Sequence, residues 1–157
     1  MTDIFSLKVE EIVSKIKDAQ LTSVEVCQKY VERISKFEKE VKAWVHFDKK
    51  LLLEKAKEAD EYRRSGKPTG PLHGIPIALK DIIGTIDMPT ECGTPIRKGK
   101  SYSQNAEIVD LLLSANNVSG NHNAIPGNMY IKNIAKITMP KNGIMPANIC
   151  INSTLFF

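Results

Sequence analysis

The most informative segment of this chain is the apolar run Ile75-Pro76-Ile77-Ala78-Leu79-Lys80-Asp81-Ile82-Ile83, which Gly84 closes. An apolar run of this length, flanked by Gly and Pro, is typical of a strand that is buried on both faces. Pro76 stands near its beginning, where a missing backbone N–H is tolerated. The pattern therefore predicts a buried strand over residues 75–83.

Three helices are predicted before this strand. Ser6 can cap the first, and Thr22-Ser23-Val24-Glu25 is a capping box that begins a second helix running to about Glu38. Asp48 begins a third helix, which runs to about Arg64. The short segment 43–47 between the second and third helices is predicted to be extended. The apolar positions of the first two helices recur at helical spacing: Val9, Ile12, Val13 and Ile16, then Cys27, Tyr30, Val31, Ile34 and Phe37.

A fourth helix is predicted after the strand, with Ser103 or Asn105 as its cap and Ile108, Val109, Leu112 and Leu113 on its apolar side. Val118 is expected to begin another strand. Helices followed by a strand, a helix and a strand indicate an α/β protein whose sheet is still incomplete.

The composition excludes several classes of protein. The chain has 157 residues, of which 42% are hydrophobic and 25% charged, as in about one globular domain. Its longest apolar runs are too short to span a membrane, and its start does not resemble a secretory signal. Three widely spaced cysteines, Cys27, Cys92 and Cys150, favour a reducing cytoplasm. No metal-ligand spacing and no Gly-rich nucleotide loop occurs, so neither a metal nor a cofactor is expected.

The last part of the chain differs in composition from the rest. Residues 1–110 contain all 18 acidic residues, whereas residues 111–157 contain three lysines and no arginine. Asparagine is absent from residues 1–100 and frequent after them. Three lysines diluted by apolar residues do not make a nucleic-acid patch, so no direct contact with nucleic acid is expected.

Lys80 is the residue that this pattern singles out for chemistry. On a strand it shares a face with Ala78 and Ile82, while Leu79 points the other way. A lysine removed from water loses its proton more readily and can act as a general base. The alternative is that Lys80 ends the strand and extends its ammonium into solvent. The pattern alone leaves both interpretations open.

The sequence around Lys80 resembles the N-terminal part of the amidase signature family. The resemblance is carried by Leu72-His73-Gly74-Ile75-Pro76-Ile77-Ala78-Leu79-Lys80-Asp81, then Gly84 and Pro89-Thr90-Glu91-Cys92-Gly93-Thr94. The opening of the family resembles residues 21–25, and its Gly-x-x-Asn turn is matched by Gly120-Asn121-His122-Asn123. The family hydrolyses or transfers amide C–N bonds, and it includes the A subunit of glutamyl-tRNA(Gln) amidotransferase.

The resemblance implies a mechanism and a role for Lys80. In the family a neutral lysine takes the proton of a bridging cis-serine, which takes the proton of the attacking serine. Backbone N–H groups then hold the oxyanion. Lys80 matches the lysine of this Ser–cisSer–Lys triad, and the implied partner is a small-molecule amide substrate. His73 and Cys92 have no catalytic role in the family, and we interpret them, like Cys27, as structural residues.

The family places its two serines in a Gly/Ser-rich stretch downstream of the Gly-x-x-Asn turn, and this chain has no such stretch. Ser114, Ser119 and Ser153 are isolated and none lies between glycines. We therefore predict a partial amidase-signature domain over residues 1–123: N-terminal helices followed by the first strands of a truncated mixed sheet. Residues 124–157 are predicted to be a non-family tail, poorly ordered or loosely packed.

Three functional hypotheses follow. The first is an amidase-class hydrolase by descent that is inactive alone because it lacks both serines. The second is a non-catalytic remnant or interaction module. The third is a fragment of a tRNA-dependent amidotransferase A subunit. All three share a cytoplasmic location and no membrane contact, and the sequence leaves the oligomeric state open.

Overall fold

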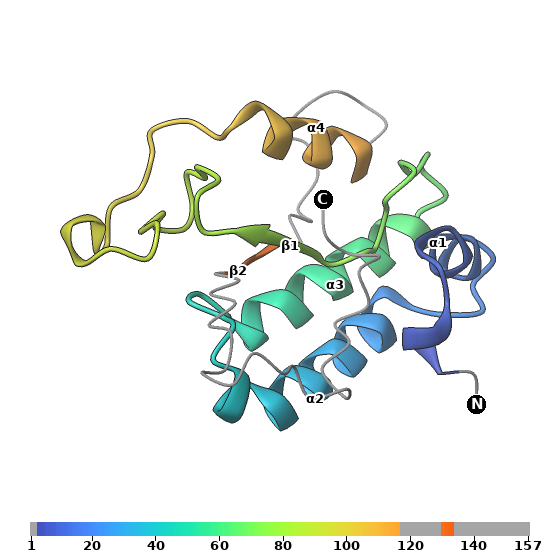
Figure 1. Cartoon of the computed structure of the whole chain (residues 1–157). Coiled ribbons are helices and arrows are strands. Elements are labelled where there is room, and N and C mark those ends of the chain that lie inside the picture. The colour runs from blue at the N-terminus through green and yellow to red at the C-terminus, as the bar shows by residue number, and fades with distance from the viewer. Residues whose placement is uncertain (1–2, 117–129, 134–157) are drawn as a thin grey trace.

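The computed structural model describes residues 3–116 and 130–133. The elements follow one another in a simple order (Figure 1): the 3-10 helix η1 (Ile4–Ser6), α1 (Val9–Lys17), α2 (Ser23–Val41), α3 (Lys49–Arg64), β1 (Ile77–Lys80), the 3-10 helix η2 (Pro95–Arg97), α4 (Glu107–Asn116) and β2 (Tyr130–Asn133). Among the described residues, no helix is both long enough and apolar enough to cross a membrane.

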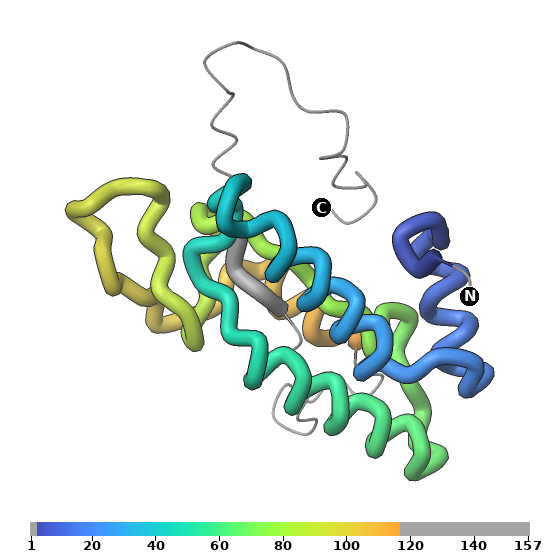
Figure 2. The backbone as a smooth tube through the Cα atoms, turned by 90° about the horizontal axis from the view of Figure 1, so that it is seen from below, coloured from blue at the N-terminus to red at the C-terminus, as the bar shows by residue number. Residues whose placement is uncertain are grey.

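The helices surround β1 on two sides. α2 and α3 run side by side, and β1 lies between this pair and α4 (Figures 1 and 2). Each interface has its own apolar cluster. The three clusters are Ile4, Ile12, Ile16, Val26 and Ile75 near α1; Cys27, Val31, Leu52, Ala56 and Ala59 between α2 and α3; and Leu79, Val109 and Leu113 between β1 and α4.

β1 and β2 pair in parallel, with Ile77 opposite Tyr130 and Lys80 opposite Asn133. A parallel pair needs a crossover connection, and α4 lies in that connection and packs on β1 through Leu79. N-terminal helices followed by parallel strands confirm the predicted α/β class. β2 lies within the predicted tail 124–157, and the boundary at residue 123 stays a prediction. The strand expected from Val118 lies outside the described residues.

The capping of α2 and α3 follows the sequence prediction. Thr22 Oγ1 accepts a hydrogen bond from the Glu25 N–H at 3.1 Å, and the Glu25 carboxylate accepts one from the Thr22 N–H at 2.8 Å. At α3 the Asp48 carboxylate accepts from the Leu51 N–H at 2.9 Å. Both caps are local patterns, which explains why the sequence shows them.

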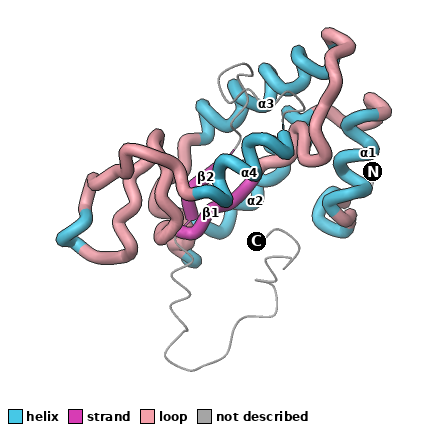
Figure 3. The backbone as a smooth tube through the Cα atoms, turned by 90° about the horizontal axis from the view of Figure 1, so that it is seen from above, coloured by secondary structure: helices cyan, strands magenta, loops and turns pink. Residues whose placement is uncertain are grey.

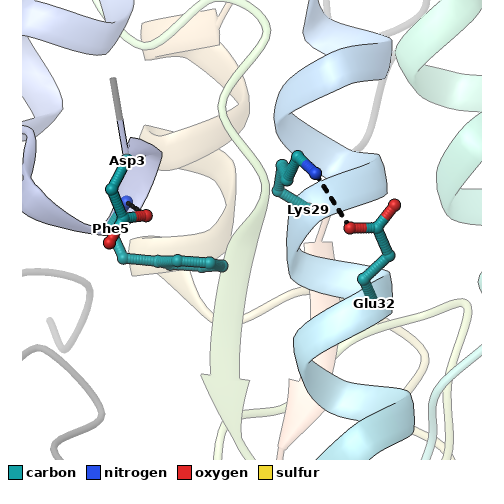
Figure 4. Close-up of polar contacts among 4 residues, drawn as sticks. All are labelled: Asp3, Phe5, Lys29 and Glu32. Carbon is teal, nitrogen blue, oxygen red and sulfur yellow. Dashed lines mark hydrogen bonds and ion pairs between the residues drawn. The ribbon is translucent and has the colours of Figure 1, made fainter. Parts of the chain in front are cut away.

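The predicted cap of the first helix is wrong. Ser6 ends η1, whose own cap is Asp3, and the Asp3 carboxylate accepts from the Phe5 N–H at 3.1 Å (Figure 4). Lys8 is the residue that precedes α1, and its N–H donates to the Glu11 carboxylate at 2.7 Å. Glu11 thus closes this helix end from within the helix.

The predicted extended segment 43–47 is a loop. The Glu38 carboxylate, near the end of α2, accepts from the N–H groups of Ala43 and Trp44 at 3.1 and 2.9 Å. Lys42 has a left-handed φ of 51°, which turns the chain there. Because the Glu38 carboxylate accepts these two N–H groups, they are not free to pair with a neighbouring strand.

β1 is also shorter than the predicted strand 75–83. At its start, the Ile75 N–H donates to the Leu72 carbonyl at 3.2 Å, and at its end the Ile83 N–H donates to the Lys80 carbonyl at 2.9 Å. A turn therefore bounds the strand on each side.

The predicted caps of α4, Ser103 and Asn105, are wrong. Ala106 is the residue that precedes the helix, and its carbonyl accepts the helical hydrogen bond from the Asp110 N–H. Asn105 instead accepts from the Ile86 N–H and donates to the Asp110 carboxylate.

A buried carboxylate joins α3 to the beginning of α2. Asp60 is 2% exposed, and its two oxygens accept from the N–H groups of Ser23 and Val24 at 2.8 and 3.1 Å. These N–H groups belong to the first turn of α2, where no carbonyl within the helix can reach them. The partial positive charge of the helix N-terminus also favours a carboxylate there. Asp60 therefore fixes the packing of one helix against the other.

The segment that enters β1 is fastened to the same place. Gly74 has a φ of 80° and lies against Ser23, so closely that a Cβ at residue 74 would overlap the Ser23 hydroxyl. His73 is buried beside it, and its Nε2–H donates to the Ala59 carbonyl at 3.0 Å. Further back, the N–H of Leu72 donates to the carbonyl of Ala115 at the end of α4. The approach to β1 is thus held by α2, α3 and α4.

Replacing Asp60 with Ala should destabilise the fold strongly. The change leaves one buried and one partly buried N–H group without an acceptor, and an unsatisfied buried group costs about 1–3 kcal/mol. Equilibrium unfolding in urea should therefore show a loss of about 3 kcal/mol. Asp48→Ala is the matched control, because it removes an exposed helix cap and should cost about 1 kcal/mol. Equal losses for the two variants would contradict the role given to Asp60.

Candidate functional site

Lys80 is the last residue of β1. Its neighbour Leu79 is 1% exposed and packs on Val109, whereas the Lys80 side chain is exposed. Ala78 lies within β1 like Lys80, but Ile82 lies beyond the strand in the following turn. The predicted alternation thus holds within the strand and ends at Lys80. Of the two interpretations, the described residues show the solvent-exposed strand end.

The next residue, Asp81, is buried at 1% exposure and binds a loop. Its carboxylate accepts from the N–H groups of Glu91 and Gly93 at 3.0 and 3.3 Å, and its carbonyl accepts from the Cys92 N–H at 3.1 Å. Three successive N–H groups of the loop therefore converge on the residue that follows Lys80. This places residues 91–93 at the carboxyl end of β1.

The segment between β1 and α4 is loop apart from the short helix η2 (Figure 3), and several polar contacts hold it. The Thr90 N–H donates to the Lys100 carbonyl at 2.7 Å, and the Gly99 N–H donates to the Glu91 carboxylate at 2.9 Å. The Arg97 guanidinium donates to the Thr90 carbonyl and lies over the Tyr102 ring. Several apolar side chains of this segment remain exposed, namely Ile82, Ile86, Ile96 and Tyr102.

The other residues considered for chemistry have structural surroundings. His73 is buried, bonded to the Ala59 carbonyl and packed on the Tyr62 ring. Cys27 is fully buried in the cluster between α2 and α3, as predicted for a small apolar residue. Ser114 donates its hydroxyl to the Asp110 carbonyl within α4 at 2.8 Å. Ser119 and Ser153 lie outside the described residues.

Within the described part of the chain, no group of three His, Cys, Asp or Glu side chains could hold a metal ion. The exposed ion pair between Lys29 and Glu32 on α2, drawn in Figure 4, joins neighbouring helical turns at 3.0 Å. Exposed pairs of this kind contribute little to stability.

Sequence reasoning did not assign a role to the Asp81 side chain. A signal was present, because Asp81 is an acidic residue inside an apolar run and a Gly-containing loop follows ten residues later. A buried carboxylate needs hydrogen-bond donors, and a loop rich in unpaired N–H groups supplies them. The pairing itself became visible only in three dimensions.

The two described cysteines should differ sharply in reactivity. Burial, together with the negative charge of Asp60, raises the pKa of the Cys27 thiol to about 12, so the reactive thiolate is absent at pH 8. Cys92 is exposed. Native protein treated with a disulfide reagent at pH 8 should be modified at Cys92 and spared at Cys27, as read by peptide mass mapping. Prior unfolding in urea should make both react, and rapid native modification of Cys27 would contradict its burial.

The chain belongs to the amidase family, whose sequence model matches residues 25–131. The A subunit of glutamyl-tRNA(Gln) amidotransferase from Streptomyces coelicolor is 37% identical to it over 115 residues, which are 73% of this chain and 23% of that protein. The chain therefore spans about a quarter of the length of the curated relatives that it matches.

Solved structures show the same fold relationship. Peptide amidase from Stenotrophomonas maltophilia superposes with a TM-score of 0.63 at 25% identity, covering 81% of this chain and 24% of that one. A fatty acid amide hydrolase superposes with a TM-score of 0.64 at 25% identity, covering 83% of this chain and 21% of that one. The helices and the β1 region thus correspond to a part of larger amidase structures.

Proposed function

We propose that this chain is the N-terminal part of an amidase-class hydrolase of amide C–N bonds, with Lys80 as the general base of a Ser–cisSer–Lys triad. The observation that carries the proposal is the position of Lys80. It ends β1 within the Gly-Ile-Pro-Ile-Ala-Leu-Lys-Asp sequence of a chain that belongs to the amidase family. In α/β sheets, ligands bind outside the carboxyl ends of parallel strands, and Lys80 lies at that end.

The proposed chemistry requires more than Lys80. A lysine serves as a base only when it has lost its proton, and removal from water is what favours that loss. The described residues leave Lys80 exposed. The environment that would desolvate the amine, and the two serines that would exchange protons with it, must therefore come from parts of an amidase that this chain does not match.

In the complete site, the Lys80 amine would take the proton of the bridging serine, and that serine would take the proton of the attacking serine. The amide carbonyl would become tetrahedral, and an acyl-enzyme would follow when the amine leaves. Residues 1–123 would be the family part, and residues 124–157 a tail outside it. We place the protein in the cytoplasm, without direct nucleic-acid contact, on the evidence of its cysteine usage and its charge distribution.

The chain alone should be inactive. Purified protein should hydrolyse neither aliphatic nor aromatic amides, and a serine-directed fluorophosphonate probe should leave it unlabelled. The reason is the missing Gly/Ser-rich stretch. Turnover that disappears in Lys80→Ala, or labelling by the probe, would show that the chain forms a complete site.

A second candidate is a fragment of an amidotransferase A subunit. It is favoured by the identity of 37% to the Streptomyces coelicolor protein over 73% of this chain. In that case the complete protein would require partner subunits for activity, whereas an amidase would act without them. A non-catalytic remnant is the remaining alternative, and it predicts that Lys80 has no role in any assembled enzyme.

A chimera tests the role of Lys80 directly. Residues 3–116 of this chain would replace the corresponding segment of the Streptomyces coelicolor protein, and amide transfer would be measured with the partner subunits present. We expect an active chimera in which Lys80→Ala lowers the rate by at least about 100-fold, the scale of a lost general base.

Lys39→Ala is the matched control, because Lys39 is an exposed lysine on α2. It should keep the rate of the chimera within about twofold, as surface substitutions usually do. A folded chimera whose activity is the same with and without Lys80 would refute the proposal and favour the non-catalytic remnant.

A further inference from the structure

The contacts at the end of β1 join two features that are separate in the sequence: the lysine motif and the Pro-Thr-Glu-Cys-Gly loop. Asp81 is the point of contact, since its carboxylate and its carbonyl together accept the N–H groups of residues 91, 92 and 93. Its burial at 1% exposure means that the loop covers it. A carboxylate in this position is stable because each of its oxygens has a donor.

The backbone of Lys80 belongs to the same arrangement. Its carbonyl accepts from the Ile83 N–H at 2.9 Å, which makes a tight turn over residues 80–83. Asp81 is the second residue of that turn, and it is the residue through which the turn binds the N–H groups of residues 91–93. Movement of Asp81 would therefore move the turn on which Lys80 sits.

We propose that Asp81 is a positioning residue for Lys80: by holding loop 91–93 across the carboxyl end of β1, it fixes the turn from which the lysine side chain projects. The inference rests on the proposed function, because positioning matters only if Lys80 has a reaction to serve.

The conformation of the loop supports this role. Cys92 and Gly93 have positive φ angles of 55° and 67°. A non-glycine residue adopts such an angle at a cost, and it persists only where surrounding contacts impose it. Nothing lies within 4 Å of the place where a Cβ on Gly93 would stand, so crowding does not impose the angle there. The contacts that hold the loop in this conformation are a turn bond from the Thr94 N–H to the Glu91 carbonyl at 3.1 Å and the three hydrogen bonds to Asp81.

Asp60 supplies a matched control from the same chain. It is buried to the same degree as Asp81 and likewise accepts two backbone N–H groups, those of Ser23 and Val24. Asp60→Asn and Asp81→Asn therefore remove the same charge and disturb the same kind of bond. The first acts at the beginning of α2 and the second at the end of β1.

The experiment uses the full chain and two measurements that need no turnover. Amide hydrogen exchange by NMR follows the Ile83 N–H, which reports on the Lys80 carbonyl, relative to the Val31 N–H in the core. Acylation by an N-hydroxysuccinimide ester, read by mass spectrometry, follows the Lys80 amine relative to Lys39. We expect Asp81→Asn to raise the relative exchange of Ile83 at least tenfold and to change the relative acylation of Lys80 at least twofold.

Asp60→Asn should instead raise exchange at Ser23 and Val24 and leave both Lys80 readouts at their wild-type values. Asp81→Glu keeps the charge but misplaces the carboxylate, so it should resemble Asp81→Asn. If it behaves like wild type, charge alone matters and the positioning role is wrong. If Asp81→Asn does not fold, Gly93→Ala carries the test, because it strains the loop while Asp81 is retained.

The proposal is overturned if Ile83 exchange or Lys80 acylation stays at its wild-type ratio in the folded variant, or if Asp60→Asn changes them equally. A purely structural Asp81 would release the amides of residues 91–93 and leave Ile83 protected. Neither measurement depends on catalysis. An inactive chimera would therefore leave the exchange and acylation results valid, and a failure of the positioning role would leave the activity of the chimera valid.

Discussion

The buried carboxylate of Asp60 is the contact on which the arrangement of the helices depends. It satisfies the first two N–H groups of α2 from a position in α3, so the two helices are fixed to each other at one end. The apolar cluster between them then fills with small side chains such as Ala56 and Ala59, which allow close approach. Burial of apolar surface supplies the stability, while the carboxylate selects the relative placement.

The segment that enters β1 contacts the same helix pair. His73 donates to the carbonyl of Ala59, the residue before Asp60. Gly74 lies against Ser23, and the N–H of Ser23 donates to the Asp60 carboxylate. The strand therefore begins at a fixed point of the helix pair and carries Lys80 at its other end. A second buried aspartate, Asp81, repeats the same chemistry there with loop N–H groups as donors. A buried carboxylate that accepts backbone N–H groups therefore lies near each end of β1.

The sequence could predict what is encoded locally. The Thr22–Glu25 box and the Asp48 cap involve residues three apart, and the helical spacing of the apolar positions is visible in the same way. Asp60 and Ser23 are 37 residues apart, and no local pattern shows that pairing. The prediction of an extended segment over 43–47 is wrong for a related reason. The Ala43 N–H, which a strand would need for pairing, donates to the Glu38 carboxylate instead. The strand pattern singles out Lys80 but leaves its role open, and the role given to it comes from the resemblance to the amidase signature family.

The contact between Gly74 and Ser23 limits how this part of the protein can vary. A positive φ already disfavours other residues at position 74, and the neighbouring hydroxyl occupies the volume that a methyl group would need. The two positions are therefore coupled through excluded volume. Enlarging either side chain would push the beginning of β1 away from α2, so substitutions accepted at one position should depend on which residue occupies the other.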